Sequence, residues 1–199
     1  QAAGHGGRWS VPGSRPTWTS VAPQTGTVPA SQAVDARVWL TPQNADQLDA
    51  LATAVSDPSS SQYGQFLTED QYKAQFAPSS DEVSAISQWL TSSGLQVVTV
   101  GPDNHYIGFD GSADAIQTAF GTQLARYVVD GKQVQAPSGD VTVPDAFAGQ
   151  VLAVTGLNTL NAVKPADFGA PAAYVNGTPC SSWYGQQQAA MAADLAEAR

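Results

Sequence analysis

The sequence has few of the residues on which metal binding and nucleophilic catalysis depend. It contains one cysteine, Cys180, and two histidines, His5 and His105, and their positions match no metal-ligand spacing. We therefore expect no bound metal. A Ser-His-Asp arrangement would have to use one of these two histidines, and neither is expected on a rigid element beside a nucleophile.

Basic residues and long apolar runs are also scarce. The chain has 8 Lys and Arg against 17 Asp and Glu, which gives a formal net charge of -9 at pH 7. Binding to nucleic acid needs clustered Lys and Arg, so we expect no nucleic-acid partner. No apolar run reaches the roughly 18 residues that span a bilayer, and we expect no membrane anchor or signal peptide. The low charge and the many Ser, Thr, Gln and Gly residues favour a secreted, extracellular protein.

The composition divides the chain into three parts. Residues 1–32 are rich in Gly, Pro, Ser and Thr, which predicts a flexible N-terminal arm. Its two large apolar groups, Trp9 and Trp18, either pack on the nearest surface, which we favour, or clamp the arm to a partner. Residues 33–160 predict one folded domain. Residues 161–199 are first rich in Pro and Gly and then in Ala, which predicts a connector.

The first half of the predicted domain contains one strand and three helices. Residues 34–40 alternate strictly between apolar and polar, as in a strand with one buried face, and Asn44 is expected to cap the next helix. Asp57-Pro58 ends that helix, because proline donates no N–H and restricts the preceding residue. Thr68 and Ser79 each begin a capping box, which marks two further helices.

The second half predicts a hairpin, a helix and a last strand. Residues 96–100 and 106–110 form the hairpin, Ser112 caps a helix that Gly121 stops, and residues 122–129 form a strand that turns at Asp130-Gly131. With the extra helices set aside, the order is β-α-β-β-α-β. This order predicts an α+β fold with a ferredoxin-like antiparallel sheet and helices on one face. Residues 132–157 are expected to add short edge strands.

Such a sheet leaves its second face uncovered. Trp39, Tyr106 and Tyr127 occupy strand positions next to inward-facing residues, so we expect all three side chains on the open face. Together with Asp35 and Asp110 they predict a docking surface for a partner, since clustered aromatic groups are unusual on a free surface. The alternative is that residues 132–157 fold over this face.

The order of the motifs resembles the activation prosegment of the sedolisins. This family of secreted serine-carboxyl peptidases includes the kumamolisins and tripeptidyl peptidases. Helix caps and turns alone explain each residue of the match but not the shared order. The residues that carry the resemblance are Asp57, Pro58, Tyr63, Gly64, Leu67, Trp89, Leu90, Gly94, Phe120, Gly121 and Pro144.

The resemblance implies the same fold and a role beside a peptidase. It implies a propeptide that acts as an intramolecular chaperone and inhibitor of a sedolisin-like catalytic domain and is released at acid pH by processing. The family's Ser-Gly-Thr-Ser run and its Glu-x-x-x-Asp pair do not occur here, so these residues are not expected to be an enzyme. We expect no cofactor, because calcium is implied only for the absent catalytic domain. Two alternatives stay open: a free-standing protease inhibitor or adaptor with the prodomain fold, and the front portion of a longer peptidase.

Two further expectations concern the complex with that peptidase. Cys180 either forms a disulfide with a cysteine early in the peptidase portion or stays a free thiol. Acid is expected to weaken the complex, because carboxylates that pair with cations lose their charge as the pH falls. Asp35 and Asp110 are the expected contributors, whereas a histidine switch at His105 would respond at higher pH.

Overall fold

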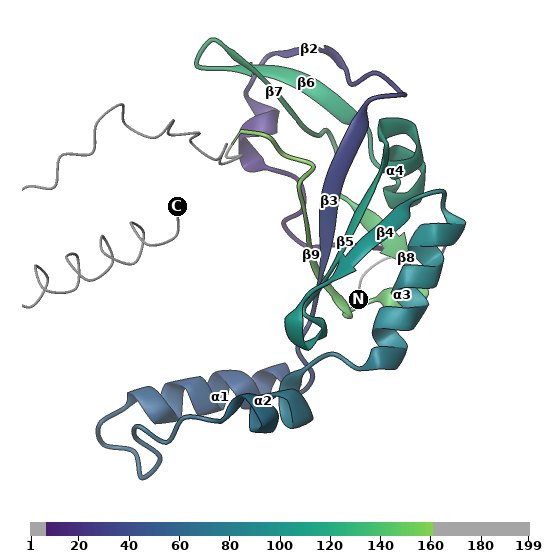
Figure 1. Cartoon of the computed structure of the whole chain (residues 1–199). Coiled ribbons are helices and arrows are strands. Elements are labelled where there is room, and N and C mark those ends of the chain that lie inside the picture. Colours follow the sequence, from purple (N-terminus) through teal and green to yellow (C-terminus); the bar gives the residue numbers. More distant parts are fainter. Residues whose placement is uncertain (1–6, 161–199) are drawn as a thin grey trace, which may run out of the picture. The chain divides into compact units, whose positions relative to one another are not determined.

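The domain is built on a four-stranded antiparallel sheet. A computed structural model describes residues 7–160. The strand order is β4 (Gln96–Val100), β5 (Tyr106–Ser112), β3 (Ala33–Leu40) and β9 (Val151–Thr155). Helices α3 (Ser80–Ser92) and α4 (Ala113–Phe120) lie on the same side of this sheet (Figure 1). This arrangement confirms the predicted α+β, ferredoxin-like fold.

The fourth strand of the main sheet is not the one that we predicted. Residues 124–129 do form a strand, β6 (Leu124–Val129), but it pairs with β2 (Gln24–Thr27) and β7 (Lys132–Pro137) in a second, three-stranded sheet. Asp130 and Gly131 have φ angles of 49° and 74°, and this tight turn folds the chain directly back as β7. The place beside β3 is taken by β9, with Leu40 opposite Val151 and Arg37 opposite Thr155.

The predicted flexible arm is wrong for residues 7–32, which are part of the fold. Strand β1 (Arg8–Ser10) pairs with β8 (Thr142–Pro144), and a short 3₁₀ helix, η1 (Thr17–Ser20), leads into β2. The Arg8 guanidinium donates to the Thr142 carbonyl at 2.9 Å, and Val11 is buried. The packing alternative for the two tryptophans is confirmed: Trp9 contacts the core, and Trp18 lies edge-on to Tyr127.

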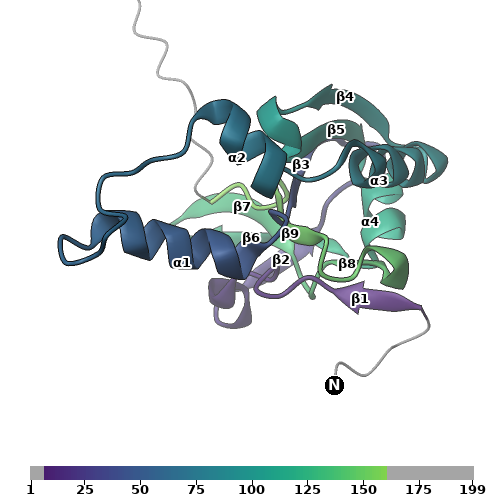
Figure 2. The same ribbon diagram turned by 90° about the horizontal axis from the view of Figure 1, so that it is seen from below.

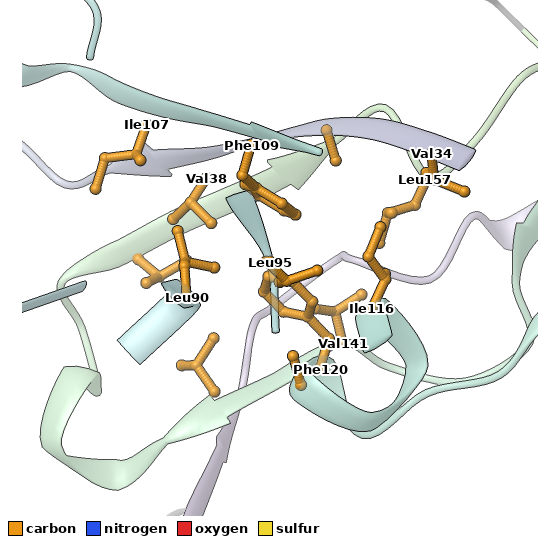
Figure 3. Close-up of a cluster of buried hydrophobic side chains, with 14 of the residues drawn as sticks. Val34, Val38, Leu90, Leu95, Ile107, Phe109, Ile116, Phe120, Val141 and Leu157 are labelled. Atoms are coloured by element: carbon orange, nitrogen blue, oxygen red, sulfur yellow. The ribbon is translucent and has the colours of Figure 1, made fainter. Parts of the chain in front are cut away.

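Aromatic side chains from both helices fill the space behind the sheet. Phe109 of β5 stacks on Phe120 of α4 with ring centroids 5.5 Å apart, and Trp89 of α3 meets Phe120 edge-on at 5.3 Å. Figure 3 shows the rings of Phe109 and Phe120 among aliphatic side chains of the sheet and helices. The largest buried members of this core are Phe109, Phe120, Ile86, Leu90, Ile107, Ile116, Leu124 and Leu157.

Most of the predicted helix boundaries are confirmed. Thr68 and Ser79 form complete capping boxes at the starts of α2 (Glu69–Phe76) and α3. The Ser112 hydroxyl caps α4 by accepting a hydrogen bond from the backbone N–H of Ala115. Asn44 precedes α1 (Ala45–Ser56), but its side chain makes no cap and donates instead to the carbonyl of Gln75 in α2. None of the helices within residues 7–160 is long and apolar enough to cross a membrane.

Helices α1 and α2 form a hairpin that stands apart from the core. Val55 and Phe76 are its buried apolar residues, and neither belongs to the core behind the sheet. The hairpin projects on the side of the sheet away from α3 and α4, as two perpendicular views show (Figures 1 and 2). The open face of the sheet and the hairpin therefore lie on the same side of the domain.

Candidate docking surface

The register of the sheet determines which side chains reach the open face. Val34, Ala36, Val38 and Leu40 of β3 are buried, so the intervening residues point away from the helices. On the next strand, Tyr106 lies opposite Trp39, Gly108 opposite Arg37, and Asp110 opposite Asp35. We define the open face as Asp35, Arg37, Trp39, Tyr106, Asp110 and Thr155.

Three of these side chains form a packed cluster at one end of the face. The rings of Trp39 and Tyr106 have centroids 5.0 Å apart, and the Arg37 guanidinium lies 5.1 Å from the centre of the Tyr106 ring. The indole N–H of Trp39 donates to the hydroxyl of Thr155 at 2.9 Å. Because this N–H is the only polar group of the side chain and is already hydrogen-bonded within the domain, Trp39 is held in one orientation and exposes only the carbon atoms of its ring to a partner.

The two carboxylates lie side by side further along the strands. Asp35 and Asp110 are directly opposed in an antiparallel pair, where like charges destabilise a sheet. Neither forms an ion pair with another described residue. Arg37, the cation nearest to them on β3, is placed over the Tyr106 ring. The open face thus combines an aromatic cluster with an adjacent pair of uncompensated negative charges.

Tyr127 does not belong to this surface, contrary to our prediction. It lies in the second sheet, is 2% exposed, and is covered by Trp18 at a centroid distance of 5.3 Å. The prediction failed because it assigned residues 122–129 to the main sheet. Our alternative, in which residues 132–157 cover the open face, is also wrong: β9 extends the sheet beside β3, and Asp35 and Arg37 are exposed.

The resemblance residues fall into two structural groups. Six of them build the core or its turns. Trp89, Leu90 and Phe120 pack between the sheet and the helices, and Gly94 and Gly121 end helices at positive φ. Pro144 of β8 pairs with Arg8 of β1. The others, Asp57, Pro58, Tyr63, Gly64 and Leu67, lie in the loop between α1 and α2.

Sequence reasoning missed one member of the open face and the role of another. The alternation of residues 34–40 places Arg37 on the same face as Asp35 and Trp39, but it carries no signal for the contact of Arg37 with Tyr106. Thr155 could not be found, because its position depends on the pairing of β9 with β3.

The remaining predictions about sites concern histidine, cysteine and metals. His105 packs against the ring of Tyr72 at 5.5 Å, beside the open face rather than in a catalytic arrangement. Within residues 7–160 there is no group of three His, Cys, Asp or Glu residues that could hold a metal ion. Cys180, the predicted connector (161–199) and residues 1–6 of the predicted arm lie outside the described residues.

Comparison with known proteins gives one family and several relatives. The family model for the activation domain of pro-kumamolisin matches residues 21–160. Sedolisin from Pseudomonas sp. (strain 101) is 37% identical over 119 residues, which cover 60% of this chain and 20% of that protein. Xanthomonalisin from Xanthomonas sp. (strain T-22) is 30% identical over 132 residues, which cover 66% of this chain and 16% of that protein.

Relatives also occur in animals. Tripeptidyl-peptidase 1 of Rattus norvegicus is 34% identical over 89 residues, which cover 45% of this chain and 15% of that protein. The match thus spans a fifth or less of each of these three relatives.

Proposed function

Because this chain belongs to the family of pro-kumamolisin activation domains, we propose that it is the propeptide of a secreted sedolisin-like peptidase, which it inhibits and helps to fold. The family match over residues 21–160 carries this proposal. The relatives support it, since one of them is named a tripeptidyl-peptidase and all three are several times longer than the matched region. The peptidase portion would therefore be the partner of this domain.

The open face is the surface that we assign to this partner. Trp39 and Tyr106 form a preorganised aromatic pair, and rigid aromatic groups contribute much of the binding free energy at protein interfaces. Asp35 and Asp110 repel each other in the free domain, so a cation of the partner placed near them would stabilise the complex. These features favour a partner surface that is apolar opposite Trp39 and basic opposite the two aspartates.

This charge arrangement supports release by acid. Carboxylates that face partner cations bind fewer protons in the complex than in the free domain, so the complex loses stability as the pH falls. A double variant, Asp35→Asn with Asp110→Asn, should bind with less dependence on pH than the wild type. His105 is the competing explanation, and the variant His105→Gln should leave the pH dependence unchanged.

Inhibition of a mature family member tests the proposal. The purified domain is titrated into mature sedolisin and into mature xanthomonalisin, and binding is followed by biolayer interferometry from about pH 7 to about pH 3, the range in which carboxylates titrate. We expect saturable inhibition of at least one peptidase, and binding that weakens toward low pH. If neither peptidase is bound or inhibited, the proposed function is wrong. If binding is independent of pH, the acid release is wrong.

A further inference from the structure

The loop at the tip of the α1–α2 hairpin has no role in the fold or on the open face. It comprises residues 57–67, between the end of α1 and the cap of α2. Two aromatic side chains in it are exposed to solvent, Tyr63 by 56% and Phe66 by 75%. Large apolar groups this exposed are unusual on a monomer when they lie close together in one loop.

The loop is held in shape by its own hydrogen bonds. The Asp57 carboxylate accepts from the backbone N–H of Ser59 at 2.9 Å and from its hydroxyl at 2.8 Å. The N–H of Gly64, a residue with φ of +71°, donates to the carbonyl of Val55 in α1 at 3.0 Å. The side chain of Gln65 bonds to the carbonyl of Ser61 at 3.0 Å. Tyr63 and Phe66 are thus presented from an ordered backbone, which lowers the entropy lost on binding.

Acidic groups flank this tip, and its nearest base is already paired. Asp57 lies at one end of the loop, and Glu69 and Asp70 lie in the first turn of α2, all of them exposed. Lys73 contacts Glu69 at 2.7 Å and Asp103 at 3.1 Å. A partner that accepts both aromatic rings would therefore present an apolar depression bordered by Lys or Arg.

The same charges disfavour a second copy of this chain as the occupant. Two tips in contact would bring their acidic groups together, at a cost from like-charge repulsion. The chain as a whole carries a net charge of -9, which opposes self-association further. The relatives, in contrast, contain a large portion outside the matched region. The hairpin also projects on the same side as the open face, so one partner can reach both surfaces (Figures 1 and 2).

We propose that Tyr63 and Phe66 at the tip of the α1–α2 hairpin form a second docking point, which inserts into an apolar depression with a basic rim on the peptidase portion. This inference rests on the proposed function. The open face and the tip then hold the partner at two separate places. The hairpin, which contributes little to the core, serves the complex rather than the stability of the free domain.

A double variant tests the second docking point. Tyr63→Ser with Phe66→Ser removes both exposed rings without touching the backbone hydrogen bonds of the loop. It is compared with the wild type in the inhibition assay described above. The inhibition constant should rise about tenfold or more, since exposed aromatic anchors that become buried are typical hot spots. Circular dichroism and the urea midpoint should match the wild type, because neither ring belongs to a core.

A matched control removes exposed apolar surface elsewhere. Val100 of β4 is also exposed, and it pairs with Ile107, whose side chain faces the helices. Val100→Ser should inhibit like the wild type.

The outcomes separate this inference from the proposed function. If the wild type inhibits and the double variant inhibits equally well, the second docking point is wrong and the proposed function stands. If the wild type itself does not inhibit, the proposed function fails. Analytical ultracentrifugation of the wild type alone tests the alternative occupant, which is a second copy of this chain. If the wild type self-associates and the double variant does not, the tip belongs to a contact between copies and the proposal is overturned.

Discussion

Trp39 is the residue on which the proposed docking through the open face depends most. It is half-buried against Tyr106, and its N–H is bonded to Thr155, so its position does not have to be fixed on binding. Trp39→Ala should weaken binding to the peptidase by about 2 kcal/mol or more. Calorimetric titration measures this loss, and near-native circular dichroism excludes unfolding. Unchanged affinity in a folded variant would contradict the assignment of the face.

Asp57 gives the loop at the hairpin tip its own dependence on pH. The backbone N–H of Ser59, and then its hydroxyl, hold the pKa of Asp57 below the ordinary value of 3.8. The stabilisation is therefore present above pH 3.8 and is lost as the pH falls through the lowered pKa. Asp57→Ala should lower the urea midpoint at neutral pH, and the difference from wild type should shrink below about pH 3.8.

Asp49 provides the control for this measurement. It is an exposed residue of α1 whose carboxylate makes no hydrogen bond to another described residue. The difference in urea midpoint between Asp49→Ala and wild type should not shrink in the same way from neutral to acid pH. If the difference in urea midpoint between Asp57→Ala and wild type stays constant from neutral to acid pH, the hydrogen bonds to the ionised Asp57 carboxylate do not stabilise the loop.

At the scale of single residues, the sequence was informative wherever the signal was local. The capping boxes at Thr68 and Ser79 and the left-handed Gly94 were predicted correctly, because each depends on neighbours within four positions. The outward position of Trp39 followed from strict alternation. Tyr127 has the same local pattern, but its burial depends on Trp18, a contact with a distant part of the chain.

At the scale of elements, α2 is attached to the turn between β4 and β5. Lys73 lies 3.1 Å from Asp103 in the short helix η2 (Pro102–Asn104), and Tyr72 packs on His105. Hydrogen bonds with Glu69 and then Asp103 raise the pKa of Lys73. Burial, and then the charge of Asp103, raise the pKa of Tyr72. Protonated Lys73 and neutral Tyr72 therefore favour the folded state below their ordinary pKa values of 10.5 and 10.0, and this contribution is lost as the pH rises through the raised pKa values.

Hydrogen exchange resolves this attachment. Lys73→Gln should speed amide exchange in α2 at neutral pH, because the half-buried Asp103 loses its cation, while exchange in α3 and β5 stays slow. Lys132→Gln, which removes an exposed cation from β7, is the control and should leave exchange in α2 unchanged. Equal exchange in α2 of Lys73→Gln and wild type would show that the ion pair does not hold the helix.

The predicted elements were mostly correct, whereas the pairing of the last strand was not. The helices and the first three strands of the ferredoxin-like order were placed correctly, since hydrophobic periodicity and turn residues are properties of short segments. Whether β6 or β9 completes the sheet is decided by long-range packing. Gly156, just after β9, shows this: it has φ of +97°, and a Cβ atom there would lie 2.5 Å from the Asp35 carbonyl. Its approach to β3 has no local signature.

At the scale of the whole domain, residues 7–32 of the N-terminal segment belong to the folded structure. Its Gly and Pro content resembled that of a disordered arm, but a few apolar residues anchor it: Val11 is 1% exposed, and Trp18 covers Tyr127. Deleting residues 1–22 should lower the free energy of unfolding by about 3 kcal/mol or more, as expected when large buried side chains are lost. Urea denaturation measures the loss.

A point variant controls for the deletion. Val21 is 83% exposed within the same segment, so Val21→Ser should leave the urea midpoint unchanged. An unchanged midpoint in the deletion variant would restore the flexible arm that the composition suggested.

Site-specific photo-crosslinking tests most directly whether the domain docks on the peptidase through its open face. A photoreactive amino acid is placed at Arg37 on the open face or at Ser84, an exposed position of α3 on the opposite side. Each domain is then mixed with a mature family peptidase and irradiated. We expect a covalent adduct from position 37 and none from position 84. An adduct from position 84 alone would show that the helical side of the domain docks instead, and would contradict docking through the open face.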